Sequence, residues 1–322
     1  MRRETRPVRI GPHNQSVRVN HLDITLLSGG PSSEREVSLA SGRSIGAALS
    51  RLGHRVSICD ISPDRMSALD RAADLVFIAL HGEFGEDGKL QAELERRGLR
   101  FTGSGSTASA LVMDKVRTKG ALIGAGLPTP RFDIARKATL SEVIRRWRLP
   151  VVVKPVSSGS SIDVFLVHEG DRFEDALRSV VRKYDTALIE ELVDGPELTV
   201  GILGSEALPP IQIRTKRAFY DYEAKYIDDA TEYNLDIDLP ADLLSRIQAM
   251  SLKAATALGC RDFCRVDWMV DKITHEPYIL ELNTIPGFTS HSLLPKAAAH
   301  SGMAFDDLCQ AIVEFAMKRS GN

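Results

Sequence analysis

Two carboxylates and an amide near the C-terminus have the residue types and spacing of a metal site with oxygen ligands. Asp267 lies in one expected strand, Glu281 lies in the next, and Asn283 follows two residues later. Oxygen-only ligation suits Mg²⁺, which commonly bridges protein carboxylates and nucleotide phosphates. A cross-strand ion pair with Arg265 is the alternative, but it leaves Glu281 and Asn283 unexplained. The three residues therefore predict a magnesium site.

A lysine at the end of a buried strand, and the loop that follows it, have the chemistry of a phosphate site. Lys154 ends the apolar run of residues 151–153, and burying a lone ammonium group is costly unless it meets an anion. The Ser- and Gly-rich residues 157–161 could surround phosphates with backbone N–H groups and hydroxyls. The spacing is not that of a P-loop kinase, and a simple flexible turn is the alternative.

A Gly-rich turn at residues 28–36 precedes an expected helix and carries Glu34. Helix N-termini attract anions, but a carboxylate at this place would repel a pyrophosphate and suits a cation such as a substrate ammonium group. The alternative is that Glu34 only complements the helix dipole.

Apolar periodicity places these residues on alternating strands and helices. The order at residues 22–104 is typical of a parallel, doubly wound sheet. Strands are expected at 22–27, 55–59, 75–80, 151–154, 164–167, 187–191, 198–203, 211–213, 264–270 and 278–281. Helices are expected at 33–52, 90–97, 108–125, 173–181, 241–258 and 305–317.

The 322 residues divide into an N-terminal extension and three units. The extension covers 1–21, and the units cover 22–104, 105–190 and 191–322, the last with a polar, Tyr-rich loop at 217–233. The extension is Arg-rich and lacks the apolar core of a secretory signal. A frayed terminus explains it better than a nucleic-acid-binding arm does.

Composition limits the classes of function. A hydrophobic share of 43% excludes disorder of the whole chain. The 41 basic and 43 acidic residues give a net charge of -2 and no footprint for nonspecific nucleic-acid binding. No stretch approaches the ~20 apolar residues of a membrane helix. Cys260 and Cys264 have no second pair of zinc ligands. We therefore expect buried thiols, a cytoplasmic location, and neither nucleic-acid nor membrane partners.

Several segments together resemble the ATP-grasp superfamily and, more narrowly, the D-alanine–D-alanine ligases. They occur in the family's order, and the resemblance covers roughly residues 22 to 317. The matching segments are residues 81–88 (HGEFGEDG), 113–115 (MDK), 195–200 (GPELTV), 219–226 (FYDYEAKY), 265–267 (RVD) and 281–290 (ELNTIPGFTS).

The resemblance implies a mixed α/β fold, in which a doubly wound N-terminal domain precedes a two-lobed ATP-grasp fold. It also implies the ATP-dependent joining of two D-alanine molecules for peptidoglycan synthesis. The first D-alanine carboxylate takes the γ-phosphoryl group, and the amine of the second attacks the acyl phosphate. The implied cofactors are ATP and two Mg²⁺ (or Mn²⁺), and relatives are commonly homodimers.

Family roles transfer to matching positions of this chain. Catalytic roles fall on Glu34, Ser160, Tyr226, Arg265 and Gly287, with Arg265 and the Gly287 N–H stabilising an oxyanion. Substrate contacts fall on Glu34, His81, Lys225, Ser292 and Leu293. The nucleotide contacts are Lys115, Lys154, Ser160, Ser161, Glu190, Leu192 and Glu197. Asp267, Glu281 and Asn283 would hold the metal ions.

The loop at 217–233 corresponds to the family's mobile lid, which would exclude water on closing. Tyr226 resembles the lid tyrosine that hydrogen-bonds to Ser160 and, through it, reaches toward Glu34. Relatives that make D-alanyl-D-lactate lack this tyrosine. The resemblance therefore implies an amine rather than a hydroxyl acceptor.

The phosphate loop departs from the family pattern at two positions. Asp163 stands where the family usually has Gly, and Ser158 stands where many relatives have Glu. Asp163 adds bulk and, if it faces the nucleotide, negative charge. This predicts a loop that is less ordered or weaker for ATP, and an Asp163→Gly variant with a lower KM for ATP.

Three alternatives remain at the level of sequence. One is an ATP-grasp ligase for another D-amino acid or dipeptide pair. Another is a nucleotide-binding sensor or scaffold without catalysis, favoured only by Asp163. A dinucleotide-dependent oxidoreductase fits the N-terminal pattern but lacks the G-x-G-x-x-G fingerprint.

Overall fold

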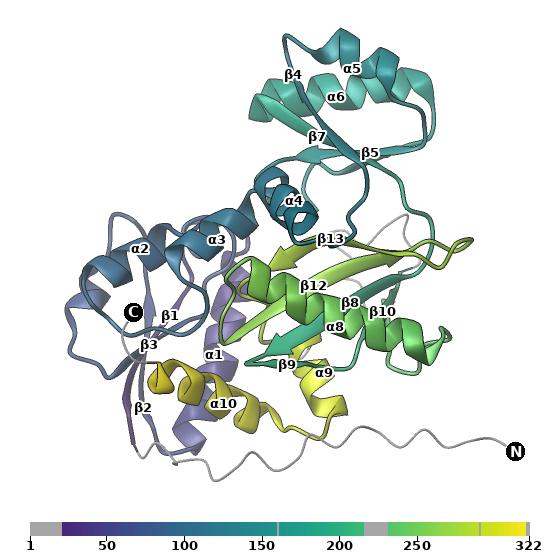
Figure 1. Cartoon of the computed structure of the whole chain (residues 1–322). Helices are drawn as coiled ribbons and strands as arrows, with labels where there is room; N and C mark the ends of the chain where they lie inside the picture. The colour runs from purple at the N-terminus through teal and green to yellow at the C-terminus, as the bar shows by residue number, and fades with distance from the viewer. Residues whose placement is uncertain (1–20, 160, 216–230, 290, 320–322) are drawn as a thin grey trace, which may run out of the picture.

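The computed structural model describes residues 21–159, 161–215, 231–289 and 291–319. These residues form three sheets with helices packed around them (Figure 1). The expected extension at 1–21 lies outside the described residues except for His21. No helix in the described ranges is long and apolar enough to span a bilayer.

The N-terminal sheet is parallel and has helices on both faces. Its strands are β1 (Asp23–Ser28), β2 (Arg55–Asp60) and β3 (Leu75–Ile78), in the order β2-β1-β3. Alternate residues of β1 point to opposite faces: Leu26 packs with Ile45 of α1 (Arg35–Arg51), whereas Leu27 packs with Leu90 of α2 (Lys89–Arg96). A short 3₁₀ helix, η1 (Ser67–Asp70), lies between β2 and β3. The predicted doubly wound parallel sheet is confirmed.

The central sheet is antiparallel and has one face covered by helices. Its order is β4-β7-β5-β6, and α5 (Leu140–Arg146) and α6 (Gly170–Tyr184) cover the face that carries Val153 and Ile189. The opposite face carries Val152, Lys154 and Glu190, so these side chains are available to a cavity. The strands are β4 (Phe132–Arg136), β5 (Val151–Pro155), β6 (Phe165–Val167) and β7 (Thr186–Glu191).

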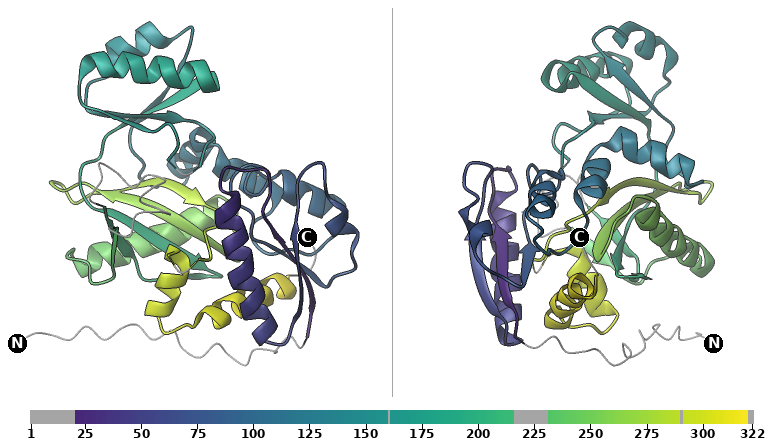
Figure 2. Two further views of the ribbon diagram at one scale, coloured as in Figure 1. Left: turned by 180° about the vertical axis from the view of Figure 1, so that it is seen from behind. Right: turned by 60° about the vertical axis from the view of Figure 1, so that its left-hand side comes forward.

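The third sheet is antiparallel, with the order β11-β10-β8-β12-β13 and β9 paired to β8. One face packs on α8 (Ala241–Ala257) through side chains such as Trp268 and Ile247. The C-terminal helices α9 (Leu293–His300) and α10 (Phe305–Lys318) share a core with the N-terminal sheet (Figure 2). The strands are β8 (Glu197–Leu203), β9 (Glu206–Ala207), β10 (Ile211–Arg214), β11 (Glu232–Asn234), β12 (Phe263–Val270) and β13 (Pro277–Asn283).

The helix predicted at 108–125 is wrong as a single element, because the structure divides it at Asp114. Asp114 has extended backbone geometry (φ -86°, ψ 101°), and its carboxylate accepts hydrogen bonds from the N–H groups of Val116 and Arg117. It therefore ends α3 (Ser106–Met113) and caps α4 (Lys115–Gly124). The break places Lys115 in the first turn of α4, with its N–H bonded to the Val156 carbonyl.

Candidate active site

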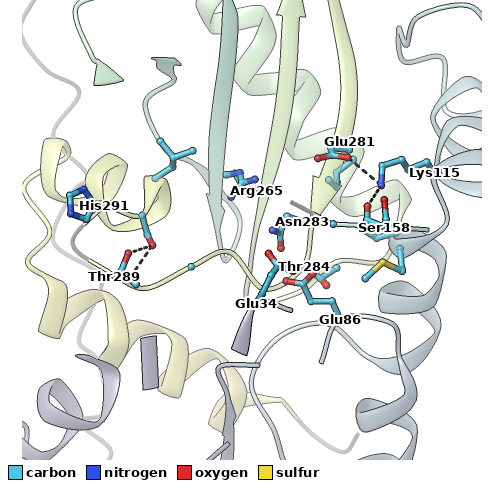
Figure 3. A pocket seen from close by; sticks show the side chains of 17 residues that line it. Glu34, Glu86, Lys115, Ser158, Arg265, Glu281, Asn283, Thr284, Thr289 and His291 are labelled. Atoms are coloured by element: carbon cyan, nitrogen blue, oxygen red, sulfur yellow. Dashed lines mark hydrogen bonds and ion pairs between the residues drawn. The ribbon is translucent and has the colours of Figure 1, made fainter. Parts of the chain in front are cut away.

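Two cavities meet between the sheets. The larger has a volume of about 790 Å³ and lies between the central and C-terminal sheets. The smaller, of about 80 Å³, is lined by the end of the C-terminal sheet and by loops of the N-terminal domain (Figure 3). Lys115, Ser158 and Glu281 line both cavities. A reaction at their junction could therefore use a large ligand from one side and a small ligand from the other.

Four predicted site residues form a two-by-two block on one face of the C-terminal sheet. Arg265 and Asp267 lie two apart on β12, and Glu281 and Asn283 lie two apart on β13. Residues two apart on a strand point to the same face. The register pairs Arg265 with Asn283 and Asp267 with Glu281. The pattern seen in the sequence therefore becomes one compact polar group at the junction of the cavities.

Arg265 and Asp267 form the ion pair considered as an alternative, but within one strand rather than between strands. Two guanidinium N–H groups donate to the two carboxylate oxygens, each at 2.8 Å. The Thr199 hydroxyl on β8 also donates to Asp267, at 2.6 Å. This pair does not use all the lone pairs of the Asp267 carboxylate, so each oxygen can accept a further bond. Glu281 and Asn283 remain outside it.

Lys115 reaches from the start of α4 to the junction. Its ammonium group donates to the Ser158 carbonyl at 2.6 Å and lies 3.5 Å from the Glu281 carboxylate. Burial lowers the pKa of Lys115, with Glu281 opposing that effect and Lys154 adding to it. Lys115 thus links the phosphate loop to the predicted metal site.

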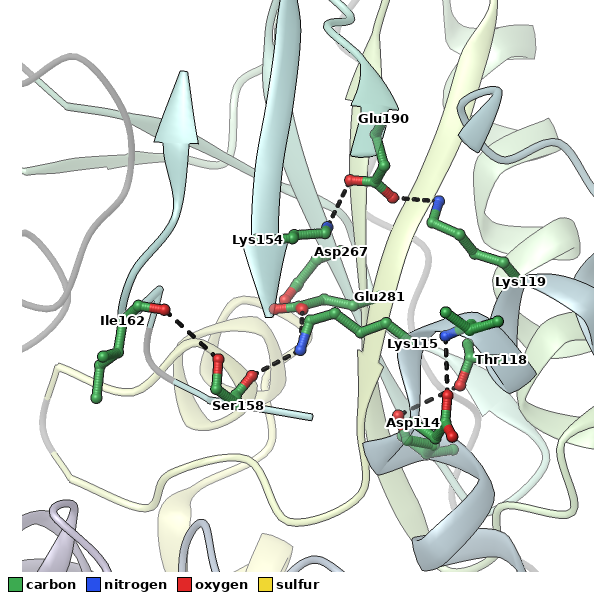
Figure 4. Close-up of polar contacts among 12 residues, drawn as sticks. Asp114, Lys115, Thr118, Lys119, Lys154, Ser158, Ile162, Glu190, Asp267 and Glu281 are labelled. Atoms are coloured by element: carbon green, nitrogen blue, oxygen red, sulfur yellow. Dashed lines mark hydrogen bonds and ion pairs between the residues drawn. The ribbon is translucent and has the colours of Figure 1, made fainter. Parts of the chain in front are cut away.

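Glu190 lies at the rear of the larger cavity between two lysines (Figure 4). Lys154 of β5 is 2.6 Å from its carboxylate, and Lys119 of α4 forms a second ion pair with it. Burial alone would raise the pKa of Glu190, but the two ammonium groups outweigh burial and lower it. For Lys154, Glu190 and Glu281 outweigh burial and raise the pKa. The structure therefore holds Lys154 on a carboxylate at the place where the sequence predicts a phosphate contact.

The remaining predicted nucleotide contacts line the same cavity. Ser161 lies on the phosphate loop, Leu192 follows β7, and Glu197 begins β8. Ser161 has a positive φ of 56°. The phosphate loop thus lines one part of the cavity, and Glu190 and Leu192 line another.

The departure at Asp163 has a structural explanation. Asp163 has a φ of 56°, a left-handed conformation that glycine adopts more easily. Its carboxylate accepts a hydrogen bond from the Lys183 ammonium group at 2.6 Å and another from the Tyr184 hydroxyl, both at the end of α6. It is absent from the lining of both cavities. The condition that Asp163 faces the nucleotide is therefore not met.

Glu34 lies immediately before α1 and lines the smaller cavity, with 7% of its surface exposed. Two glycines lie against it. A Cβ atom on Gly82, which has a φ of 67°, would come within 2.8 Å of a Glu34 carboxylate oxygen, and one on Gly159 would come within 3.2 Å. Small residues therefore let two loops approach the carboxylate closely.

His81 is buried beside this cavity rather than lining it. One ring nitrogen lies 3.0 Å from the Ile285 carbonyl and 3.5 Å from Glu86, and the other lies 3.3 Å from the Ser41 hydroxyl. Burial alone would lower the pKa of His81, but Glu86 and Glu34 outweigh it and raise the pKa. His81 is therefore placed to act through Glu86, which does line the cavity.

Gly287, Ser292 and Leu293 form the far wall of the smaller cavity. Ser292 precedes α9, and its hydroxyl accepts a hydrogen bond from the Thr289 N–H at 2.9 Å. A Cβ atom on Gly287 would lie 2.6 Å from that hydroxyl, so glycine permits the close approach. The wall thus includes the N-terminus of α9, which favours a negatively charged group.

Three predicted site residues lie outside the described residues: Ser160, Lys225 and Tyr226. Most of the predicted lid also lies there. Within the described ranges, no group of three His, Cys, Asp or Glu side chains is arranged to hold a metal ion. The predicted metal site has two carboxylates and an amide, so it depends on Asn283 as the third ligand.

Two further functional candidates, Glu86 and Lys119, carried no prediction from the sequence. Glu86 lies inside the quoted segment 81–88 but carried no separate prediction. Lys119 follows Lys115 by one helical turn, a spacing that puts both on one face of a helix. That spacing was a usable signal, because it holds in the predicted helix at 108–125 as well as in α4.

Comparison with known proteins gives a consistent result. The family described as "D-ala D-ala ligase C-terminus" matches residues 125–314, and "D-ala D-ala ligase N-terminus" matches residues 64–104. A D-alanine–D-alanine ligase of Moorella thermoacetica is 41% identical over 310 residues, which cover 92% of this chain and 100% of the relative.

Solved structures agree. The D-alanine–D-alanine ligase of Bacillus anthracis has a TM-score of 0.81 and 35% identity, over 92% of this chain and 98% of that one. Its complex with ATP has a TM-score of 0.78 and 33% identity over the same shares. The VanG D-Ala:D-Ser ligase of Enterococcus faecalis has a TM-score of 0.81 and 26% identity, over 92% and 100%.

Proposed function

The chain belongs to the D-alanine–D-alanine ligase family, which uses ATP to join two D-alanines for peptidoglycan synthesis, and we propose that the paired cavities carry out this reaction. The observation that carries the assignment of the site is the junction of a large and a small cavity at Lys115, Ser158 and Glu281. ATP would enter the larger cavity, and the two D-alanines would occupy the smaller one. The γ-phosphate would then meet the first carboxylate at the junction.

The reaction has two steps. A carboxylate oxygen of the first D-alanine bonds to the γ-phosphorus, and the bond from that phosphorus to the β–γ bridging oxygen breaks, which releases ADP. The amine nitrogen of the second D-alanine then attacks the acyl carbon. The tetrahedral intermediate expels phosphate, and the nitrogen loses a proton. Positioning and charge stabilisation therefore supply most of the catalysis.

The residues of the junction match these charges. Lys115 and Lys154 would contact the phosphates, and Lys154 would leave Glu190 to do so. Arg265 and the Gly287 N–H would stabilise the oxyanion, which requires preorganised donors. The bidentate bond to Asp267 already fixes the Arg265 guanidinium.

The residues of the C-terminal sheet fit two Mg²⁺ (or Mn²⁺). Asp267 and Glu281 are opposite each other in the register, and Asn283 lies on the same face as Glu281. Carboxylate and amide oxygens are the ligands that Mg²⁺ prefers. When bound, these ions would neutralise charge on the transferred phosphoryl group. Arg265 forms an ion pair with Asp267, and Lys115 forms one with Glu281.

The rest of the nucleotide would extend along the larger cavity. Glu197 would hold the ribose, Glu190 and the backbone near Leu192 would meet the adenine, and Ser160 and Ser161 would meet the phosphates. Ser161 and Glu197 flank the cavity from different lobes, so the nucleotide would hold the two sheets together. We propose on this basis that the units 105–190 and 191–322 form the two sides of the nucleotide site.

The two D-alanines would lie in the smaller cavity. Glu34 would bind the ammonium group of the first, which agrees with the expectation from its place at a helix start. Ser292, the Leu293 backbone and Lys225 would bind the carboxylate of the second, with His81 acting through Glu86. The loop at 217–233 would close over both, with Tyr226 bonded to Ser160.

Phosphate release tests the function directly. With ATP, Mg²⁺ and D-alanine, the enzyme should release phosphate in step with ADP formation, and L-alanine should give only background. The product, D-alanyl-D-alanine, should appear in the same ratio. A failure to release phosphate with any D-amino acid, despite ATP binding, would favour the sensor or scaffold alternative. Asp163 no longer supports that alternative, because it points away from the cavities.

A second acceptor deserves a parallel assay. The VanG relative is a D-Ala:D-Ser ligase, so D-serine should be compared with D-alanine as the second substrate. We propose that D-alanine gives the higher kcat/KM. A higher value for D-serine would assign the chain to another substrate pair within the family.

We also propose a homodimer and a cytoplasmic location, both from family precedent. Light scattering after size-exclusion chromatography should give about twice the chain mass of 35.3 kDa. Cell fractionation should recover the enzyme with cytoplasmic markers.

A further inference from the structure

A buried carboxylate between two buried ammonium groups is an unusual feature of the nucleotide cavity. Glu190 has 2% of its surface exposed, Lys119 has 1%, and Lys154 has 7%. Such charges are retained in a core only when each has a partner. The group carries a net charge of one positive unit, so one lysine exceeds what Glu190 needs. The second lysine is therefore expected to have a further role.

The two lysines have different surroundings. Lys154 lines the larger cavity and lies within the field of Glu281, toward the junction. Lys119 lines neither cavity. Its ammonium group donates to the Thr129 hydroxyl at 2.5 Å, and Thr129 donates to the Ile279 carbonyl at 2.9 Å. It also lies 5.4 Å from the centre of the Phe132 ring. Lys119 is therefore held by groups outside the cavity, whereas Lys154 faces the cavity.

From this asymmetry, and resting on the proposed function, we propose that Lys119 is a positioning residue of the nucleotide site. It keeps Glu190 a carboxylate after Lys154 has turned to the phosphates. Glu190 then accepts a hydrogen bond from the amino group at C6 of the purine. Lys119 thereby couples phosphate binding to the choice of base, without touching the nucleotide.

Whether Glu190 is ionised or protonated decides which purine base it can hydrogen-bond. Adenine presents an N–H donor at C6, which a carboxylate accepts, whereas guanine presents a carbonyl, which a carboxylate repels. A protonated Glu190 would donate to that carbonyl instead. The charged groups facing Glu190 are Lys154 on β5 and Lys119 on α4, with Lys115 at the start of α4 and Glu281 on β13 beside the lysines. Of these, only Lys119 is fixed next to Glu190 from outside the cavity.

Nucleotide binding by a Lys119→Met variant of the full chain tests the proposal. Affinities for ATP and GTP are measured by calorimetry between pH 6 and pH 9 without D-alanine, so the result does not depend on ligase activity. In Lys119→Met, Glu190 must either keep Lys154 away from the phosphates or become protonated. We expect about tenfold weaker ATP binding or more, with a smaller preference for ATP over GTP. That preference should recover as the pH rises and Glu190 ionises.

Two further variants separate this role from a structural one. Lys119→Arg keeps the charge and should restore the wild-type preference for ATP over GTP. Arg117→Met removes an exposed cation from the same helix and should behave as the wild type. Circular dichroism establishes that each variant is folded. The proposal is overturned if Lys119→Met binds both nucleotides with unchanged affinity. It is equally overturned if the loss is the same for ATP and GTP at every pH.

Discussion

Two carboxylates near the larger cavity each lie between two side-chain donors, but one carboxylate is buried and the other is partly exposed to water. Glu190 lies between Lys154 and Lys119 in the interior, and Asp163 lies between Lys183 and Tyr184 at the end of α6. The Glu190 side chain is 2% exposed, whereas those of Asp163 and Lys183 are 29% and 60% exposed. The arrangement of atoms is similar, but water reaches only one of them.

Burial decides what each arrangement contributes. Water screens an exposed ion pair, and the ordering of two side chains offsets most of what remains. A buried charge without its partner has no such compensation. We therefore expect changes at Glu190 and its lysines to affect the stability of the whole site, and changes at Asp163 to affect only the loop beside it.

The largest expected effect is that of Glu190→Gln. This change leaves two buried ammonium groups with a neutral partner, and breaking a buried pair costs about 3–5 kcal/mol. Urea unfolding at pH 7.5 should show this loss in the free energy of unfolding, together with weaker ATP binding. A loss below about 1 kcal/mol would mean that the buried Glu190 ion pairs contribute no more to stability than exposed ones do. Burial would then not distinguish Glu190 from Asp163.

Acid should remove the difference between wild type and Glu190→Gln. The pKa of Glu190 is lowered in the folded protein from its ordinary value of 4.5, because the two lysines outweigh burial. A lowered pKa contributes stability that is present above the unfolded value and is lost as the pH falls through the folded value. The stability difference between the two proteins should therefore be constant above about pH 5.5 and shrink below pH 4.5. A difference that grows in acid would contradict the assignment.

The parts of the site that depend on residues close together in the sequence could be predicted, and the parts that depend on distant residues could not. Strand periodicity was enough to place Arg265 with Asp267, and Glu281 with Asn283, on one face of each strand. The register that brings the two pairs together depends on how β12 pairs with β13. The division of residues 108–125 at Asp114 was not predictable, since it depends on a side-chain cap and on the Val156 carbonyl, which is 41 residues from Lys115. Consequently the distinct placement of Lys115 and Lys119 stayed hidden.

Other parts of the fold escaped prediction for related reasons. Strand β4 and helix α9 are short, and α9 begins beside the segment that the family resemblance had already assigned to substrate binding. The direction of Asp163 depends on Lys183 and Tyr184, 20 and 21 residues later in the chain. Periodicity reports which face a residue lies on but not which distant partner it meets.

Asp163→Asn tests the exposed carboxylate. Lys183 and Tyr184 stabilise the charged form of Asp163 and thereby lower its pKa. Asparagine keeps the size of the side chain but removes that charge. We expect a loss of less than about 1 kcal/mol in the free energy of unfolding. The KM for ATP should rise by no more than about threefold. A loss as large as that of Glu190→Gln would contradict the comparison.

Asp163→Gly should have the smallest effect, because two consequences oppose each other. Glycine relieves the left-handed backbone conformation at φ 56°, which costs an L-residue about 1–2 kcal/mol, but it also removes the link from the phosphate loop to α6. The lower KM expected from the sequence loses its electrostatic reason, since the carboxylate points toward α6. We therefore expect a KM for ATP within about twofold of the wild type. Lys183→Met provides the matched control, because it breaks the link without relieving the backbone. If Asp163→Gly binds ATP much more tightly while Lys183→Met does not, backbone conformation rather than the link governs the loop, and the carboxylate is only a tolerated replacement for glycine.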